Sequence, residues 1–225
     1  LHKVLAQAGL GSRLDMERLI AEGGVTVNQA VAHVGQRVKA GDQIKVQGRL
    51  VRWQAQGQTP RVLAYHKPAG ELVTLDDPLN RPTVFRTLPR LQNGKWQSVG
   101  RLDLNTEGLL LFTSSGELAN RLMHPRFGLE REYAVRVFGT VDEDMLARMR
   151  DGVDIDGETF QFDDIVVGDG EGANHWYYCV VQSGRQREVR RLWESQGVKV
   201  SRLMRVRFGN MMLPTDLRAG HSVEL

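Results

Sequence analysis

The stretch GRLDLNTEGLLL, residues 100–111, places one aspartate between two glycines and directly before an apolar run. Residues 109–112 form a short apolar run preceded by turn residues, a pattern typical of a buried strand. Asp103 is therefore expected on a loop that a core strand supports. A carboxylate held in this way can act as a nucleophile, a general base or a metal ligand, or it can cap the backbone of its own turn.

The surroundings of Asp103 narrow these options. A metal ion is disfavoured, because no second acidic residue or histidine lies at convincing ligand spacing around this aspartate. We therefore expect no metal. Glu107 is a second acid nearby, and a glycoside hydrolase would need two such carboxylates about 5 to 9 Å apart around a sugar. That alternative stays open on these two residues alone.

The sequence after residue 111 predicts an α+β domain. Residues 114–117 read Ser-x-x-Glu, the spacing of a capping box, and predict a helix through Met123. Tyr133, Val135 and Val137 alternate on one face of a following strand. Later residues predict strands near 160–167, 177–181 and 200–208, and helices near 142–150 and 188–196. The expected fold is a mixed, mainly antiparallel sheet with flanking helices.

The sequence before this domain predicts a small module and a linker. Residues 1–48 contain two stretches with helical spacing, the second capped by Ser12, and then residues that alternate with period two. Residues 49–60, RLVRWQAQGQTP, are polar, rich in glutamine and closed by proline, which is typical of a linker. We therefore predict a first domain over 1–48, a linker over 49–60 and a second domain over 61–225.

The composition is that of a globular protein. The 225 residues are 41% hydrophobic and 25% charged, which suffices for one large core or one core with a small module and excludes disorder as the main state. No apolar run reaches 18 residues, so we expect a cytoplasmic protein with no membrane partner. The single cysteine, Cys179, cannot form an internal disulfide and is expected as a buried thiol in an apolar strand.

Basic residues cluster towards the end of the sequence. The net charge is only +3, but the sequence pI is about 9.2. The clustered residues are Arg185, Arg187, Arg190, Arg191, Lys199, Arg202, Arg205 and Arg207. Such clustering suits a polyanionic partner, although a solvated helix face balanced by Glu188 and Glu194 would also explain it. In a helix over 188–196, Arg190 borders the apolar stripe. That stripe consists of Val189, Leu192, Trp193 and Gln196.

A family resemblance gives these residues a specific meaning. The stretch 100–111 resembles the active-site motif of the pseudouridine synthases. Three further stretches resemble motifs of the small-subunit and large-subunit ribosomal branch of that family. They are GELANRLMHP at 116–125, EREYAV at 130–135 and GRQREVRRL at 184–192. The resemblance covers nearly the whole second domain. It implies an enzyme that converts uridine to pseudouridine in ribosomal RNA, with the large-subunit (23S) RNA as substrate.

The first domain resembles the S4 RNA-binding module. The similar stretches are LAQAG at 5–9, GSR at 11–13, VTVN at 25–28 and VKAGD at 38–42. Two residues depart from the pattern: Gln29 stands where glycine is general, and Leu14 stands where a second basic residue is common. Both departures would loosen RNA contact in this module and leave the catalytic motifs untouched. The resemblance implies that Arg13 and Lys3 bind RNA.

The resemblance also implies the roles of the catalytic residues. The isomerisation breaks the N1–C1′ bond of uridine, turns the base and joins C5 to C1′, so we expect no cofactor. Asp103 is expected to attack C1′ or C6, or to remove a sugar proton, and Arg190 is expected to pair with it through two charge-assisted bonds. Tyr133, a core aromatic by spacing alone, is expected to stack on the base and to accept or relay the C5 proton. Arg101 is expected to occupy the gap left by the flipped uridine.

The remaining basic residues and the partner follow from the same resemblance. Arg185, Arg187 and Arg191 are expected to bind RNA phosphates, whereas His124 is expected to be a structural hydrogen-bonding residue. The expected partner is ribosomal RNA or a ribosome assembly intermediate, bound by a monomer. One rival is a protein of the same fold that binds RNA without modifying it. The arginine-rich surface and the S4-like module argue against the glycoside hydrolase.

Overall fold

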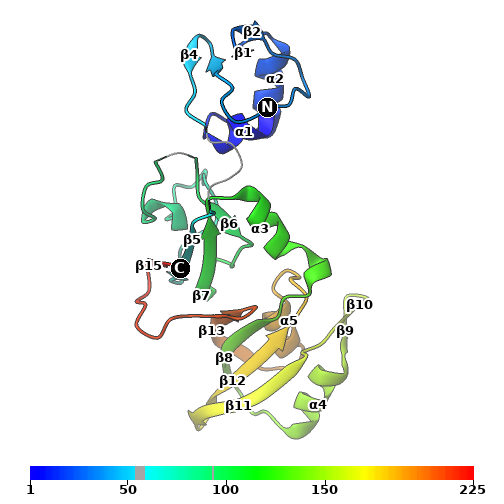
Figure 1. Ribbon diagram of the computed structural model, residues 1–225. Helices are drawn as coiled ribbons and strands as arrows, with labels where there is room; N and C mark the ends of the chain where they lie inside the picture. Colours follow the sequence, from blue (N-terminus) through cyan, green and yellow to red (C-terminus); the bar gives the residue numbers. More distant parts are fainter. Residues whose placement is uncertain (54–58, 93) are drawn as a thin grey trace. The chain divides into compact units, whose positions relative to one another are not determined.

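The computed structural model describes residues 1–53, 59–92 and 94–225, which divide into two compact units (Figure 1). The first unit comprises Leu1–Arg61, Pro89–Gln97 and Thr113–Gly116, and the second comprises Val62–Leu88, Ser98–Phe112 and Glu117–Leu225. Both units contain helices and strands, so the predicted α+β class is confirmed. Over the described ranges, no helix is both long enough and apolar enough to span a bilayer.

The first unit begins with two short helices and a small antiparallel sheet. Helices α1 (His2–Gln7) and α2 (Arg13–Ala21) precede β1 (Val25–Val27), β2 (Ala30–Val31), β3 (Ile44–Val46) and β4 (Arg49–Leu50), which pair in the order β2-β1-β3-β4. Ser12 caps α2 as predicted, because its hydroxyl accepts the N–H of Asp15 at 3.1 Å and the Asp15 carboxylate accepts the N–H of Ser12. The core of this unit includes Leu5, Met16, Ile20, Val25 and Ile44.

The turn between β1 and β2 shows why glycine suits position 29. Asn28 and Gln29 have φ angles of 49° and 71°, as the central residues of a type I′ hairpin turn require. A side chain in this left-handed region costs roughly 1–2 kcal/mol. The Asn28 side chain offsets part of its own cost through hydrogen bonds with Asp42 and Gln43. Gln29 has no such bond in the described part of the chain, so it bears the cost that glycine would avoid.

The packing of the first unit continues past residue 48. Leu50 belongs to β4, Val51 donates its N–H to the Ile44 carbonyl at 2.8 Å, and Trp53 donates its indole N–H to the Asp42 carbonyl at 2.9 Å. These residues lie inside the range 49–60 predicted as a linker, so their contacts favour ending the first domain after Trp53. Residues 54–58 of that range lie outside the described residues, and the domain limits remain a prediction.

The second unit is built on a nine-stranded sheet. Its strands are β5 (Val62–Lys67), β6 (Gln97–Val99), β7 (Glu107–Thr113), β8 (Arg131–Phe138), β11 (Asp164–Glu171), β12 (Asn174–Val181), β13 (Lys199–Phe208), β14 (Met211–Met212) and β15 (Ser222–Glu224). The main order is β11-β12-β8-β13-β7-β5-β15, with β6 beside β7 and β14 beside β13. Strand β13 runs parallel to β7, whereas β8 is antiparallel to both β12 and β13. The mixed, mainly antiparallel sheet is confirmed.

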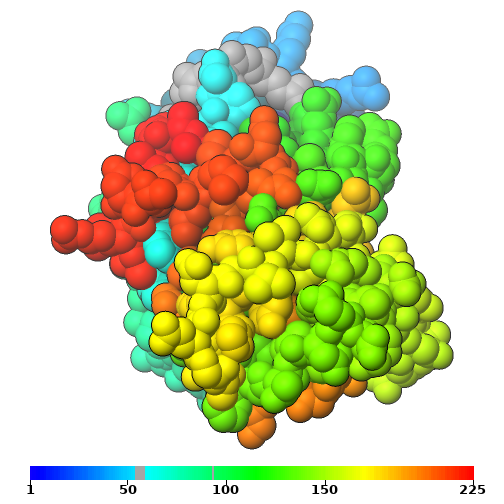
Figure 2. Space-filling model, turned by 90° about the horizontal axis from the view of Figure 1, so that it is seen from below, coloured from blue at the N-terminus to red at the C-terminus, as the bar shows by residue number. Residues whose placement is uncertain are grey.

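Helices complete this unit and pack against its sheet. They are η1 (Val84–Arg86), α3 (Gly116–Met123), η2 (Pro125–Phe127), α4 (Glu143–Asp151) and α5 (Glu188–Ser195), and a hairpin of β9 (Val153–Ile155) and β10 (Glu158–Phe160) follows α4. Met149 of α4 and Trp193 of α5 pack with Val135 of β8 and Cys179 of β12 in the largest core cluster. Cys179 is fully buried, as expected. Figure 2 shows the yellow residues of β11 and β12 beside the yellow-green residues of α4.

The capping box expected at Ser114 is not formed. Helix α3 begins at Gly116, one residue later than a cap at Ser114 requires. The Ser114 hydroxyl instead accepts the N–H of Arg61 at 2.9 Å, and Glu117 accepts a bond from Arg121 one turn along the helix. The spacing of Ser114 and Glu117 therefore predicted the helix correctly but not the hydrogen bond that begins it.

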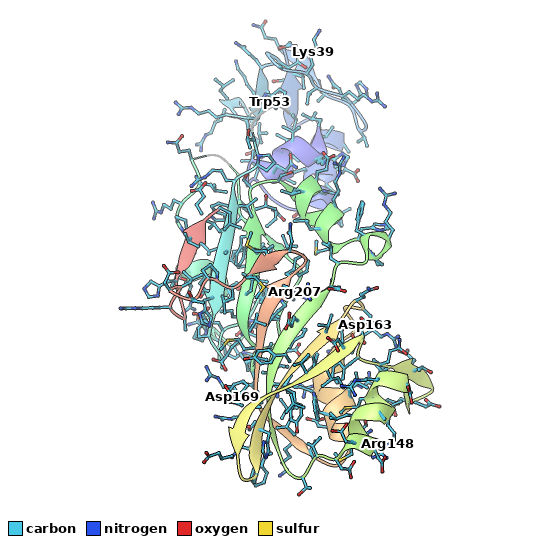
Figure 3. All side chains as sticks on the ribbon, turned by 60° about the horizontal axis from the view of Figure 1, so that its bottom comes forward. Lys39, Trp53, Arg148, Asp163, Asp169 and Arg207 are labelled. Carbon is cyan, nitrogen blue, oxygen red and sulfur yellow. The ribbon has the colours of Figure 1, made fainter. Side chains whose placement is uncertain are left out.

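Two other predictions fail at the ends of elements. The strand expected over 160–167 is interrupted, because the N–H of Phe162 donates to the Met149 carbonyl at 2.8 Å and the chain leaves the sheet to bury that phenyl ring. Gln196 does not belong to the inward stripe of α5. It follows the last residue of the helix, half-buried, and its side-chain oxygen accepts a bond from Arg148, labelled in Figure 3, at 2.9 Å.

Gly108 lies where β7 and β13 run side by side. Its φ is +104°, and a Cβ atom there would lie 2.2 Å from the carbonyl oxygen of Arg205 and 2.7 Å from its nitrogen. Both atoms belong to the backbone of β13, so neither can yield without disturbing the parallel pairing. A glycine is therefore required for β13 to approach the strand that follows the Asp103 loop.

We expect Gly108→Ala to lower the free energy of unfolding by about 3 kcal/mol or more, because it adds a backbone clash to an unfavourable φ. Gly157→Ala is the matched control: Gly157 also has a positive φ, +82°, but nothing lies within 4 Å of its Cβ position. That control should lose about 1 kcal/mol. Urea unfolding followed by tryptophan fluorescence measures both variants. Equal losses would show that the fold does not depend on this close approach.

Candidate active site

Asp103 lies on the loop between β6 and β7, as predicted. The loop is anchored by the buried side chains of Leu102 and Thr106, and Thr106 donates its N–H to the main-chain carbonyl of Asp103 at 3.0 Å. The Asp103 carboxylate itself is half-buried and caps no backbone N–H of the described residues. The turn is therefore closed by main-chain atoms, and the carboxylate is left available for chemistry.

Lys67, at the end of β5, binds the backbone of this loop, and no motif of the sequence pointed to this residue. Its ammonium group is fully buried and donates to the carbonyls of Thr106 at 2.7 Å, Pro68 at 3.0 Å and Leu104 at 3.2 Å. Burial lowers the pKa of Lys67 to about 8, although the nearby carboxylates, Asp103 among them, oppose that shift. All three ammonium protons are thus used to fix the backbone around Asp103.

Arg190 of α5, far from this loop in the sequence, also binds its backbone. Its side chain is 9% exposed, and its Nη2 donates to the carbonyl of Asn105 at 3.0 Å. Burial lowers the pKa of Arg190, the neighbouring Arg187 adds to that effect, and the charge of Asp103 opposes it. Arg190 therefore contacts the loop that carries Asp103.

The expected two-bond pairing of Arg190 with Asp103 is absent from this structure. Among the described residues the two side chains form no ion pair, because Nη2 is directed to the Asn105 carbonyl while the buried Nε has no partner. Arg190 thus orients the Asp103 loop through its backbone and acts on the carboxylate as a nearby positive charge.

Tyr133 lies in β8 on the face that packs against the core. In the sheet it pairs with Cys179 of β12 on one side and Arg205 of β13 on the other, and Arg205 in turn pairs with Gly108 of β7. The Tyr133 ring packs against the largest core cluster yet is only half-buried. It is therefore a partly exposed aromatic at the border of the core, one strand away from the residues that continue the Asp103 loop.

The basic residues at the start of α5 have acidic partners that the sequence did not suggest. Arg185 pairs with Glu158 at 3.3 Å and Arg191 pairs with Asp156 at 3.0 Å, and both guanidinium groups lie over the ring of Phe160. The balancing acids thus belong to the β9–β10 hairpin, not to Glu188 and Glu194. Glu188 is instead buried and accepts the hydroxyl of Ser183, and burial raises its pKa. Arg187 is exposed, with a φ of 54°.

Glu107, the second acid of the glycoside hydrolase alternative, is already bound. Arg202 donates to its two oxygens at 2.9 and 3.1 Å. Both oxygens of this carboxylate are therefore occupied by one guanidinium and do not face an open sugar site. The geometry therefore counts against a paired-carboxylate mechanism.

The other predicted residues lie apart from this loop. Arg101 is exposed two residues before Asp103. The His124 ring accepts the N–H of Arg126 at 3.2 Å, a structural bond of the kind expected. Arg13, exposed on α2, and Lys3, half-buried on α1, belong to the first unit. Within the described residues, no group of three acidic, histidine or cysteine side chains could hold a metal ion.

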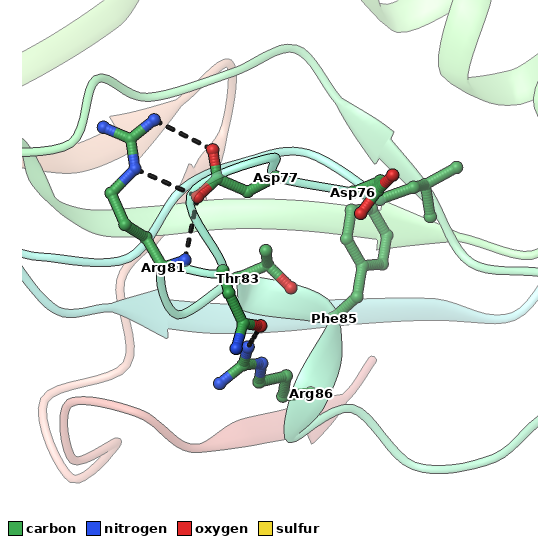
Figure 4. Close-up of a pocket in the computed structure, with 8 residues that line it drawn as sticks. Asp76, Asp77, Arg81, Thr83, Phe85 and Arg86 are labelled. Atoms are coloured by element: carbon green, nitrogen blue, oxygen red, sulfur yellow. Dashed lines mark hydrogen bonds and ion pairs between the residues drawn. The ribbon is translucent and has the colours of Figure 1, made fainter.

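A separate cavity of about 230 Å³ lies under the loop before η1 (Figure 4). Its polar walls are largely paired with one another, because Arg81 forms two side-chain bonds with Asp77 and Arg86 donates to Asn80. None of the site residues predicted from the sequence lines this cavity. The cavity and the Asp103 loop are therefore formed by different residues of the second unit.

Family models identify the class of protein to which this fold belongs. A family model described as RNA pseudouridylate synthase matches residues 61–195, and a model of the S4 domain matches residues 1–44. The chain belongs to the RNA pseudouridylate synthase family.

Individual relatives sharpen this assignment. The chain is 56% identical over its whole length to ribosomal large subunit pseudouridine synthase B of Pseudomonas aeruginosa, and covers 59% of that protein. It is 54% identical over 98% of its length to the protein of that name from Pasteurella multocida, of which it covers 65%. The chain thus spans about three fifths of the length of these relatives. A crystal structure of a pseudouridylate synthase is similar with a TM-score of 0.67 and 25% identity, covering 100% of this chain and 95% of that one.

The depressed pKa of Lys67 makes a prediction about stability and pH. The folded protein has a pKa of about 8 at this site, against an ordinary value of 10.5 in the unfolded chain. Between these values the unfolded chain binds more protons, so the Lys67 contribution makes the free energy of unfolding rise with pH, by up to about 3 kcal/mol. We expect the difference in unfolding free energy between wild type and Lys67→Met to grow in favour of wild type from pH 7.5 to pH 10.

Urea unfolding at a series of pH values measures this difference. Lys199→Met is the matched control, since Lys199 is exposed on β13. Its curve should stay parallel to that of wild type. Parallel curves for Lys67→Met as well would show that the buried ammonium is not held as described.

Proposed function

We propose that this protein converts uridine to pseudouridine in the large-subunit (23S) ribosomal RNA, with Asp103 as the reacting carboxylate. The family membership supports the reaction, and the names of the two relatives support the substrate. The observation that carries the proposal is the Asp103 loop, whose backbone is bound by the buried cations Lys67 and Arg190 while its carboxylate stays available.

This arrangement suits an isomerisation. The reaction rearranges one bond within a nucleotide, so it needs a fixed nucleophile, a held base and a proton acceptor, and it consumes no second substrate. Asp103 must be ionised to attack C1′ or C6 or to remove a sugar proton, and Lys67 and Arg190 bind the backbone of the loop that carries it. Because the loop backbone is fixed before RNA arrives, little reorganisation is needed at the moment of reaction.

The partly exposed ring of Tyr133 would stack on the target base and accept or relay the proton from C5. Arg101, exposed next to the nucleophile, would occupy the space that the uridine leaves when it is drawn out of its stack. Base flipping would therefore bring the uridine from the RNA to the Asp103 loop.

RNA binding would rest on exposed basic residues. Arg187 is free to meet a phosphate, while Arg185 and Arg191 would exchange Glu158 and Asp156 for phosphates. Surface ion pairs contribute only about 0–1 kcal/mol, so this exchange costs little. Arg13 and Lys3 would bind RNA in the S4 domain. We further propose that the protein acts as a monomer in the cytoplasm, on free ribosomal RNA or on an assembly intermediate, since one chain supplies every residue named here.

The first test is to map pseudouridine with carbodiimide adducts on unmodified large-subunit ribosomal RNA after incubation with the protein. We expect one new stop in reverse transcription, absent with Asp103→Asn, because the amide cannot act as a nucleophile or base. Unmodified small-subunit RNA is the parallel substrate. A stop on that RNA alone would overturn the substrate, and a stop that persists with Asp103→Asn would overturn the nucleophile. RNA binding with no stop on either RNA would favour the binding-only rival.

A second test separates chemistry from binding. We expect Arg190→Leu to reduce the single-turnover rate roughly 100-fold with little change in Kd, because it removes the charge and the bond that orient the loop. Arg13→Ala should do the reverse and weaken binding several-fold, because it removes a phosphate contact. Filter binding and single-turnover assays measure the two quantities. Arg148→Ala, on α4, is the control that should change neither, and equal effects of Arg190→Leu on rate and Kd would contradict this division of roles.

A further inference from the structure

Arg205 is a buried cation for which the proposed function has no role so far. Its side chain is 3% exposed, its Nε donates to the Leu109 carbonyl at 2.8 Å, and its guanidinium lies 5.1 Å from the ring centre of Phe208. Its Nη2 is buried and has no hydrogen-bond partner in the described part of the chain. No carboxylate among the described residues forms an ion pair with it. A buried charge without a counterion is costly, so a negative group that meets it is strongly favoured.

The other arginines of β13 form ion pairs with acidic residues. Arg202 is paired with Glu107, and Arg207, labelled in Figure 3, is paired with Glu130 and Glu132. The register of β13 against β8 shifts between Arg205 and Arg207. One residue is therefore inserted there, and Arg207 faces the opposite side of the sheet from Arg205. Among the described arginines of this strand, Arg205 alone is buried without an acidic partner.

The phenol of Tyr133 is a group beside Arg205 that can become negative. The two residues are directly opposite each other in the antiparallel pairing of β8 and β13, so their side chains share one face. Burial lowers the pKa of Arg205, Tyr133 opposes that shift, and Arg131 adds to it. On the other side of Arg205 lies Gly108, whose missing side chain lets β13 approach the strand that continues the Asp103 loop. The guanidinium thus stands between the phenol and that strand.

We propose that Arg205 is a positioning residue that orients Tyr133 and stabilises it as the phenolate that takes the proton from C5. The inference rests on the proposed function, because it explains how one residue of that reaction is made competent. Tyr133 would contact the base, whereas Arg205 acts only through Tyr133.

Once C5 is joined to C1′, the C5–H bond breaks and its proton forms the O–H bond of the Tyr133 phenol. The electron pair of the C5–H bond forms the C5=C6 double bond, the π pair of the C6=N1 bond moves to N1, and N1 takes up a proton from water. The phenol then releases its proton to solvent and returns to the phenolate. The guanidinium of Arg205 stays protonated throughout and offsets the negative charge of the phenolate.

The test uses RNA that carries deuterium at C5 of the target uridine, compared with unlabelled RNA in single-turnover assays of the whole chain. Arg205→Met is expected to slow pseudouridine formation roughly 100-fold, the usual range for loss of a general base, with a primary isotope effect larger than that of wild type. Tyr133→Phe should show the same enlarged isotope effect. RNA affinity should be unchanged in both variants, since neither side chain is assigned to phosphate binding.

Arg205→Lys keeps the charge and is expected to restore part of the rate. It also serves if Arg205→Met does not fold. In the Tyr133→Phe background, Arg205→Lys should cause no further loss, because there is no phenolate left to stabilise. Arg207→Met, on the outward face of the same strand, is the control that should leave the isotope effect unchanged.

The outcomes separate this proposal from the proposed function. Absence of pseudouridine with the wild type would overturn the function itself. An active wild type together with a slow Arg205→Met that shows no enlarged isotope effect would mean a purely structural arginine. The same conclusion would follow if Arg205→Lys and Tyr133→Phe reduced the rate independently.

Discussion

The buried ammonium of Lys67 is the interaction on which the site depends. A fully buried lysine is tolerated only when its protons are satisfied, and here the acceptors are three main-chain carbonyls, two of which belong to the loop that carries Asp103. Moving that loop would leave both the ammonium and the carbonyls unsatisfied in a dry environment. The position of Asp103 is therefore fixed by the free-energy cost of leaving these buried groups without hydrogen bonds, and not by contacts of its own side chain.

This constraint explains why the electrostatics of the site favour anions. Lys67, Arg190 and Arg205 are buried cations, and the only carboxylate of the loop left without a guanidinium partner is that of Asp103. Burial lowers the pKa of Lys67 and of Arg190. Glu71, Glu107 and Asp103 partly restore that of Lys67, and Asp103 partly restores that of Arg190, so the low-dielectric surroundings that make these cations costly also make their attraction to an anion strong. A site of this kind is incomplete without negative charge, which ionised Asp103, a phenolate and the RNA backbone can all supply.

Much of this fold could be predicted from the sequence, and what was missed has physical reasons. The apolar run after Gly108 identified the strand behind Asp103, and the spacing around Trp193 placed Arg190 at the border of the core. Lys67 gave no signal, since a lysine beside a Pro-Gly turn is ordinarily solvated and only tertiary packing buries it. Arg205 did leave one: it alternates with the buried Leu203 along its strand, so period two points it inward. Because Arg205 stands among other arginines in the sequence, it was counted as part of a basic cluster, and its place in the alternation of the strand was not used.

Both the fold and the site depend on Gly108, because it has no side chain. The close approach of β13 to β7 requires it, and that approach carries Arg205 to the Leu109 carbonyl and thereby towards Tyr133. A larger residue at 108 would move β13 outward and would draw the buried guanidinium away from both neighbours. The glycine that follows Asp103 by five positions is thus a requirement of strand packing. Its presence in the motif reflects the distance between two backbones as much as the conformation of a loop.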